Sequence, residues 1–269
     1  MATTAVPRRA ARRPRVPDRA LPWLGVLAAL VVFEIVPRVG LIDRRYFPPV
    51  SEMIRALVDQ LGTASFWTAV GNTLEGAAIG LGIACAVAIP VGIVVGSSDL
   101  AYRSLRAVIE FLRPIPSVAL IPLAVLVYGT GLESKVFLVI FASFWPVLVQ
   151  ALYGVQDVDP VAMDTARSFG FSRASRMWHV TLPSATPYIA TGIRISAAVA
   201  LILAVTAELV IGAPGLGKEI NVAREGGASD VMYALIIVTG LLGWLLNALF
   251  TRLERRALHW HPSQRVGTA

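Results

Sequence analysis

Three stretches of the chain are long enough to cross a membrane and contain no charged residue, namely 76–98, 136–156 and 231–251. A membrane-spanning helix needs about 20 mostly apolar residues. Composition agrees, because 56% of the residues are hydrophobic, only 15% are charged, and the mean hydropathy is +0.68. These values exclude an ordinary soluble enzyme, a disordered chain and a fibrous protein. The sequence therefore predicts an integral membrane protein.

Three further apolar stretches contain embedded charges and complete a set of six predicted spans. They are 21–39 with Glu34, 106–130 with Glu110 and Arg113, and 187–212 with Arg194 and Glu208. The alternation of apolar and polar residues that marks a membrane β-strand is absent, and a helix satisfies its own backbone in lipid. We therefore predict an all-α fold with six transmembrane helices.

Basic residues are distributed unevenly between the two sides of the predicted spans. With the N-terminus in the cytoplasm, fifteen Lys and Arg residues flank the spans on the inner side and seven on the outer side. This bias predicts that both termini are cytoplasmic, and it accounts for the net charge of +7 without a nucleic-acid partner. We expect a basic arm over 1–20, a transmembrane domain over 21–254 and a cytoplasmic tail over 255–269. No cleavage site follows 21–39, so this segment is interpreted as an uncleaved helix.

Two features predict how the helices pack. Gly76 with Gly80, and Gly92 with Gly96, form pairs of small residues four apart, which permit close contact between helices. We expect this contact to lie within the chain. On the outer side, Ser51 is a candidate N-cap for a short amphipathic surface helix.

The segment 157–186 is too polar to span a membrane and too long for a tight turn, and ordered loops of this length are usually functional. Asp159-Pro160 marks a break, because the residue before proline avoids the helical conformation. A short helix is expected over 161–169, and Gly170 suits the left-handed residue that ends it. Ser172 is a candidate cap for a second helix, which Pro183 is expected to end. The pattern predicts two short helices held under the membrane. They could be an ordered connector or a docking element for a cytoplasmic partner.

This segment carries a spaced motif: an acidic residue with two small residues, three further residues, Gly, nine residues, then β-branched-x-Leu-Pro. The positions are Asp164, Thr165, Ala166, Gly170, Val180, Leu182 and Pro183. In this it resembles the Glu-Ala-Ala signature of the inner-membrane permeases of binding-protein-dependent ABC importers, with Asp and Thr in place of the first Glu and Ala. Shorter segments, including 47–50, 113–116 and 215–217, resemble the subgroup that imports nitrate, sulfonates and taurine.

The resemblance implies a type I-like ABC importer permease in a bacterial inner membrane. It implies a second permease copy, cytoplasmic ATP-binding subunits that dock on 162–183, and an extracytoplasmic solute-binding protein. It also implies a small anionic solute, alternating access, ATP hydrolysis on the partner and no cofactor on this chain. The alternative class is an ATP-independent secondary transporter, which would show internal repeats, and no convincing repeat is present.

Ionisable residues inside spans are costly and are therefore candidates for the translocation path. We select Arg113, Arg194 and Glu208, because an anionic solute would favour the two arginines. Pro114 and Pro116 join them, since broken helix at membrane depth is tolerated where it lines a cavity. The competing interpretation is that both arginines reach the membrane surface.

The segment 212–219 nearly matches a phosphate-binding loop. A true loop ends in Ser or Thr, whereas Glu219 occupies that position, and the segment follows a predicted membrane helix. We therefore predict no nucleotide binding here. The single cysteine, Cys85, and the scattered histidines give no predicted metal site, and no catalytic motif is present.

Overall fold

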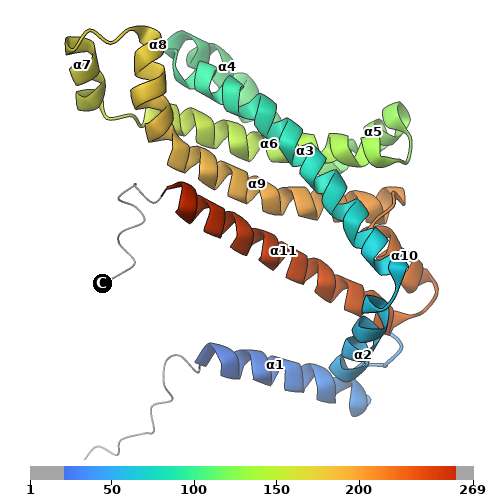
Figure 1. The fold of residues 1–269 in the computed structure, drawn as a ribbon. Helices are drawn as coiled ribbons and strands as arrows, with labels where there is room; N and C mark the ends of the chain where they lie inside the picture. Colours follow the sequence, from blue (N-terminus) through green and yellow to red (C-terminus); the bar gives the residue numbers. More distant parts are fainter. Residues whose placement is uncertain (1–20, 259–269) are drawn as a thin grey trace, which may run out of the picture.

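The computed structural model describes residues 21–258, and every regular element in that range is a helix or helical turn (Figure 1). The elements are α1 (Leu21–Arg38), α2 (Val50–Leu61), α3 (Ala64–Gly96), α4 (Asp99–Leu112), η1 (Ser117–Leu120), α5 (Ile121–Tyr128), α6 (Leu132–Gln156), α7 (Pro160–Ser168), α8 (Arg173–Arg176), η2 (Met177–Thr181), α9 (Leu182–Ile211), α10 (Leu216–Glu225) and α11 (Ser229–Ala257). The predicted all-α class is confirmed. The arm over 1–20 and the tail beyond Leu258 lie outside the described residues.

The predicted span over 106–130 is wrong in its bounds. Within the described chain, five helices are long and apolar enough to cross a membrane. A sixth span exists only if α4 and the segment Ser117–Tyr128, bent by 80°, are counted together. The break falls at 113–116, where Pro114 and Pro116 each lack a backbone donor and interrupt the helix. The chain therefore crosses this region as a broken element.

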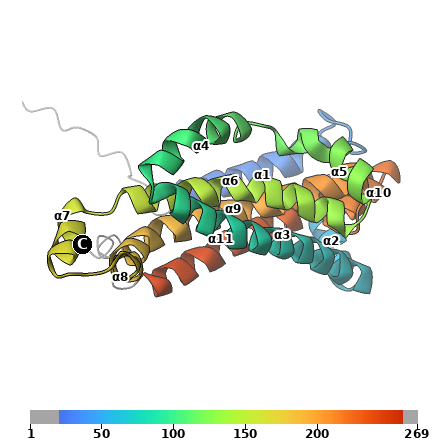
Figure 2. The same cartoon turned by 90° about the horizontal axis from the view of Figure 1, so that it is seen from above.

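The centre of the bundle is built from α3, α6 and α9, and Figure 2 shows these helices with α11 running along one another. The glycines of α3 face α6 closely. A Cβ on Gly80 would lie 2.5 Å from a Val139 side-chain carbon, and one on Gly92 would lie 2.7 Å from the Ala151 Cβ. These distances are shorter than carbon atoms tolerate, so only glycine permits this spacing. The expected packing of small residues within the chain is confirmed.

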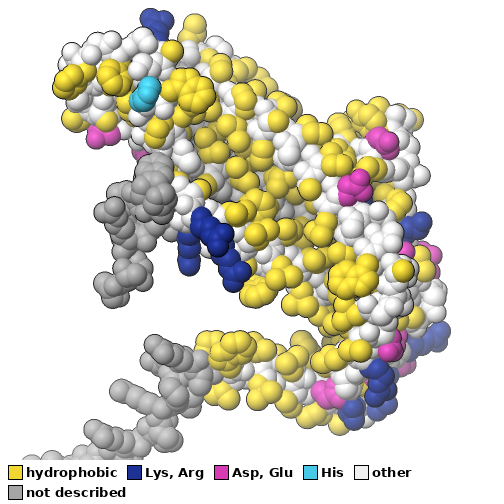
Figure 3. All heavy atoms as spheres, viewed as in Figure 1, with side chains coloured by type: hydrophobic (Ala, Val, Ile, Leu, Met, Phe, Trp, Pro, Cys, Tyr) yellow, Lys and Arg dark blue, Asp and Glu magenta, His cyan; other side chains and the backbone are white. Residues whose placement is uncertain are grey.

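The first helix, α1, stands apart from the bundle. Figure 3 shows an open gap between α1 and the rest of the molecule, and Pro37 is the one buried residue in this helix. Helix α1 is held at its end through α2, because Ser51 donates to Glu34 from its backbone N at 2.9 Å and from its hydroxyl at 2.8 Å. The surface helix is confirmed, but Pro49 occupies its N-cap position, so the expected cap at Ser51 is wrong.

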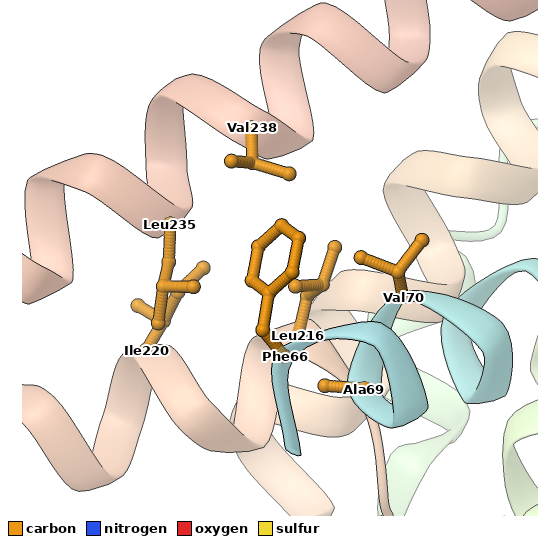
Figure 4. Packing of buried hydrophobic residues seen from close by; sticks show 7 residues of the cluster. All are labelled: Phe66, Ala69, Val70, Leu216, Ile220, Leu235 and Val238. Carbon is orange, nitrogen blue, oxygen red and sulfur yellow. The ribbon is translucent and has the colours of Figure 1, made fainter. Parts of the chain in front are cut away.

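A hydrophobic cluster ties three helices together at the end of the bundle opposite α7 and α8. Phe66 of α3 is 3% exposed and packs among Leu216 and Ile220 of α10 and Leu235 and Val238 of α11 (Figure 4). An aromatic side chain buried in this way contributes more than its aliphatic neighbours to packing. The cluster therefore fixes α10 and α11 against the start of α3.

Replacing Gly92 by Ala tests the α3–α6 contact. The added Cβ meets Ala151 and the Leu148 carbonyl oxygen, at 2.7 and 2.8 Å. We expect the free energy of unfolding to fall by about 1–3 kcal/mol, as for other overpacked cores. Gly82→Ala is the matched control, because nothing lies within 4 Å of its added Cβ. Thermal unfolding in detergent measures both variants, and equal stability would contradict the close packing.

Candidate functional site

The first short helix of the loop, α7, has a firm start. The Asp159 side chain accepts a hydrogen bond from the Val161 backbone N at 2.8 Å, and Pro160 is the first helical residue. Both are favourable at a helix N-terminus, because the side chain satisfies a free donor and proline has none to satisfy. The predicted short helix is present, but it begins at Pro160, one residue before the expected start at Val161.

The end of α7 explains the spacing between Ala166 and Gly170. Gly170 has φ +76°, and its N donates to the Arg167 carbonyl oxygen at 2.9 Å, while the Phe171 N donates to the Ala166 carbonyl oxygen at 3.0 Å. This pair of bonds is the Schellman motif, which needs a left-handed residue that glycine adopts without strain. The predicted left-handed glycine is confirmed, and Ala166 is buried under the turn.

The second helix begins as expected and ends differently. The Ser172 hydroxyl accepts from the Ser175 N at 3.2 Å, which confirms the predicted cap. The helix does not stop at Pro183, however, but continues through the π-helical turn η2, which contains Val180, into α9. The Leu182 N donates to the Met177 carbonyl oxygen, five residues back. This wider turn accommodates the missing donor and the ring of the proline, so the helix is not broken.

Much of the α7 surface faces outward. Asp164 has a side chain 69% exposed and pairs with Arg167 at 2.8 Å, while the Thr165 hydroxyl bonds back to the Val161 carbonyl oxygen at 2.7 Å. Phe169 is 78% exposed at the tip. Sequence reasoning missed Phe169, although a large aromatic residue beside a turn glycine in a polar loop is a recognisable signal for contact with a partner.

A cavity of about 500 Å³ lies between α7, α8 and the ends of the long helices. Three arginines line it, namely Arg167, Arg173 and Arg176. The loop therefore stands off one end of the bundle, and it presents positive charge to this cavity together with apolar side chains at its tip.

A buried ion pair lies near the opposite end of the bundle. Lys135 of α6 and Glu208 of α9 have side chains 2% and 0% exposed, and the Lys135 Nζ lies 2.9 Å from the Glu208 Oε1. The same Nζ donates to the carbonyl oxygens of Asn72 at 2.8 Å and Pro214 at 3.0 Å. Lys135 directly precedes the predicted span over 136–156 and is buried here. The signal for its pairing was an acid in one apolar span and a base at the edge of another.

The segment 212–219 wraps around this carboxylate. The second oxygen of Glu208 accepts from the Thr73 hydroxyl at 2.9 Å and from the Gly217 N at 3.0 Å. A Cβ on Gly215 would lie 2.1 Å from a Glu208 side-chain atom, so glycine is required there. The likeness to a phosphate-binding loop has a physical basis, because the Gly217 N–H at the start of α10 donates to an internal anion, and the Leu216 N–H donates at 2.9 Å to the Thr73 hydroxyl that also binds this anion. Both oxygens of Glu208 are occupied within the chain, and its role in a translocation path stays a prediction.

The other residues predicted to line the translocation path lie in different parts of the structure. Arg194 lies 3.4 Å from Glu254 of α11, in a partly exposed pair. Arg113, directly after α4, lines a different cavity of about 320 Å³, together with residues of α6 and α9. Pro114 and Pro116 form the break beside it. Glu110, which could have paired with Arg113, pairs with Arg106 at 2.7 Å instead.

Within the described residues, helices long and apolar enough to cross a membrane form a bundle, and the short helix α7 projects at one end (Figure 1), which is the architecture of an integral membrane protein. The sequence profile of the family described as "binding-protein-dependent transport system inner membrane component" matches residues 88–259, and the chain belongs to this family.

Several permeases are similar to this chain over most of its length. The taurine transport system permease protein TauC of Escherichia coli (strain K12) is 36% identical over 88% of this chain and 89% of that protein. The putative aliphatic sulfonates transport permease protein SsuC of the same organism is 29% identical, covering 93% and 95%. The nitrate import permease protein NrtB of Leptolyngbya laminosa is 30% identical, covering 72% and 69%.

Two solved structures support the fold. An inward-facing MetNI methionine ABC transporter matches with a TM-score of 0.63 at 19% identity, covering 71% of this chain and 95% of that chain. A bacterial alginate ABC transporter, in complex with its alginate-bound periplasmic protein, matches with a TM-score of 0.62 at 15% identity, covering 89% and 96%. The described helices therefore have the fold of an ABC importer permease.

Breaking the buried pair tests its contribution to stability. Lys135→Met leaves the Glu208 carboxylate without its counter-charge, and we expect a loss of about 3–5 kcal/mol in the free energy of unfolding. The double variant Lys135→Met/Glu208→Gln should recover part of this loss, because no lone charge remains. Arg103→Met removes an exposed pair with Asp99 and serves as control, with a change within about 1 kcal/mol. Equal values for all three variants in detergent unfolding would contradict a structural role for the pair.

Proposed function

We propose that this chain is the membrane-spanning subunit of an ATP-driven importer for a small anion, working with a second copy of itself. Two cytoplasmic ATP-binding subunits and an extracytoplasmic solute-binding protein complete the assembly. ATP hydrolysis takes place on the partner, and this chain supplies the pathway and its alternating access.

The observation that carries the proposal is the geometry of the loop 157–186. Its first helix is capped at both ends, and it stands off the end of the bundle (Figure 1). It presents Phe169 and Val161, 78% and 72% exposed, beside the acidic Asp164. A rigid helix with apolar anchors and one acid suits a groove in a partner that contains a basic residue. This supports docking of an ATP-binding subunit on the loop.

The arrangement of the described ends supports the orientation. Helix α1 begins, and helix α11 ends, at the same end of the bundle as α7 and α8 (Figure 1). With the loop in the cytoplasm, the arm over 1–20 and the tail over 255–269 are cytoplasmic too, which agrees with the excess of basic residues there. The membrane is the inner membrane of a bacterium.

The surface of α1 supports a second permease copy. Its large apolar side chains are exposed over its whole length, and α4 buries none of its residues within the chain. Exposed apolar surface of this extent is covered by lipid or by another subunit.

The names of the relatives support the class of solute, because taurine, aliphatic sulfonates and nitrate share a small anionic head group. Arg113 at the break between α4 and η1 provides a positive charge within the spans. The solute is therefore a small oxyanion, and the solute-binding protein makes the first selection.

Purification of the tagged chain from its own host in mild detergent tests the assembly. We expect a Walker-motif ATPase to copurify, identified by mass spectrometry, because the loop provides its docking surface. A chain that is reproducibly alone, and that moves solute into liposomes without ATP, would favour the secondary transporter and overturn the proposal.

Gly170→Val tests the coupling role of the loop. A β-branched residue in a left-handed conformation costs at least about 1–2 kcal/mol and opens the Schellman turn. We expect uptake to fall about tenfold or more and less ATPase to copurify, with the same amount of chain in the membrane. Gly227→Val is the matched control for copurification, because Gly227 has φ +72° at the opposite end of the bundle. Unchanged uptake in Gly170→Val would contradict the coupling role.

A further inference from the structure

The cavity beside Arg113 has the make-up of a small-molecule site. Its volume of about 320 Å³ falls within the range of about 300–1,000 Å³ that such sites occupy. Most of its lining is apolar, including Ile195 and Leu203 of α9. Its polar side chains come from three elements: Arg113 follows α4, Ser117 begins η1, and Trp145 and Gln150 belong to α6.

None of these four polar side chains has a hydrogen-bond or ion-pair partner within residues 21–258. Only the Trp145 Nε1 is buried, and a buried donor without a partner is unusual in a folded chain and calls for a ligand or water. Arg113 is exposed, and Ser117 and Gln150 are half-buried, so these three side chains are free to contact a molecule in the cavity. All four can donate: the guanidinium and the indole N–H donate only, while the hydroxyl and the amide donate as well as accept. The cavity is therefore rich in donors.

The indole ring of Trp145 is held in a fixed position. The rings of Phe144 and Phe141 pack against it edge to face, with centroids 5.1 and 5.9 Å away and interplanar angles of 89° and 78°. Its Nε1 is buried without a partner. Such edge-to-face contacts restrain the orientation of an aromatic ring, although the N–H itself is covered in this conformation.

The charge of the cavity is positive. Arg113 is the one ionisable side chain among its lining residues in the described chain. The nearest acid along the chain, Glu110, is occupied by Arg106 at 2.7 Å and does not neutralise it. Arg113 is exposed and has no ion-pair partner within residues 21–258, so an anion that enters the cavity meets an available positive charge. Guanidinium groups bind oxyanions through two parallel hydrogen bonds, which suits a sulfonate or nitrate group.

We propose that this cavity is the intramembrane site through which the transported oxyanion passes, with Arg113 binding its charged head and Ser117, Gln150 and Trp145 supplying further donors. This inference rests on the proposed import of a small anion. It goes beyond that function by naming the cavity that selects the solute by its charge. The apolar wall from α9 takes the remainder of the solute. The indole N–H, which is covered in this conformation, is exposed to the solute as the helices part.

The test uses the complete transporter in its own host and follows uptake of radiolabelled taurine, ethanesulfonate and nitrate. The variants are Arg113→Gln, Arg113→Lys and Trp145→Phe, which removes the N–H and keeps an aromatic ring. The controls are Arg103→Gln, at an exposed ion pair, and Trp244→Phe, at a side chain 65% exposed. ATP hydrolysis by the copurified complex is measured in parallel.

We expect Arg113→Gln to lower the maximal uptake rate about tenfold or more, in line with the loss of a charge-assisted hydrogen bond. Arg113→Lys should stay within about threefold of the wild type, because it keeps the charge, and Trp145→Phe should lose about threefold or more. The KM should stay unchanged, since capture outside the membrane belongs to the solute-binding protein. ATP hydrolysis should stay within about twofold of the wild type.

Two results would overturn the site and leave the importer in place. One is uptake by Arg113→Gln and Trp145→Phe equal to that of the two controls. The other is equal loss of uptake and ATP hydrolysis in Arg113→Gln and Arg113→Lys, which would show a structural role. Failure of the wild-type transporter to import any of the three anions would instead contradict the proposed function itself.

Discussion

The buried pair between Lys135 and Glu208 constrains the rest of the bundle more than any other interaction described. Its members come from α6 and α9, and the groups that complete their hydrogen bonding come from α3 and from the segment 214–217, which leads into the first turn of α10. Two desolvated charges tolerate little error in position, because each lost partner leaves a buried polar group unpaired. Four parts of the chain are therefore fixed to one another at a single point. The glycines at 76, 215 and 217 make the approach possible, since a Cβ at any of them would overlap the pair or its neighbours.

The helices could be predicted from the sequence because hydrophobic length is a property of the segment alone. The loop could be predicted for a similar reason: Asp159, Pro160, Gly170 and Ser172 act on the backbone within a few residues of themselves. The cap at Ser51 was misplaced by two residues, since its hydroxyl binds Glu34 of α1, which is a contact between helices. Local rules thus hold until a distant side chain competes for the same group.

The predictions that were wrong also failed because they considered only residues close together in the sequence. Pro183 ends a helix by the local rule, yet the π-helical turn before it absorbs the missing donor and the chain runs on as α9. Lys135 looks like a loop residue, and its true surroundings depend on α3 and α9, 63 and 73 residues away in sequence. The cavity beside Arg113 has the same character, because its lining is assembled from η1, α6 and α9. Contacts of long sequence separation are set by packing, and no window of sequence contains them.

The continuity of α8, η2 and α9 has a mechanical consequence. The helical segment Arg173–Ile211 counts 39 residues, and at 1.5 Å per residue its length is about 60 Å. The loop lies at one end of this segment, and Glu208, with Gly215 and Gly217 packed against it, lies near the other end. Because the far end is fixed by the buried ion pair, a displacement of the loop would tilt the helix about Glu208. The wall of the cavity formed by Ile195 and Leu203 lies along this helix and would move with it. The π-helical turn η2 lies between α8 and α9, and it is the place where the regular hydrogen bonding of the α-helix is interrupted.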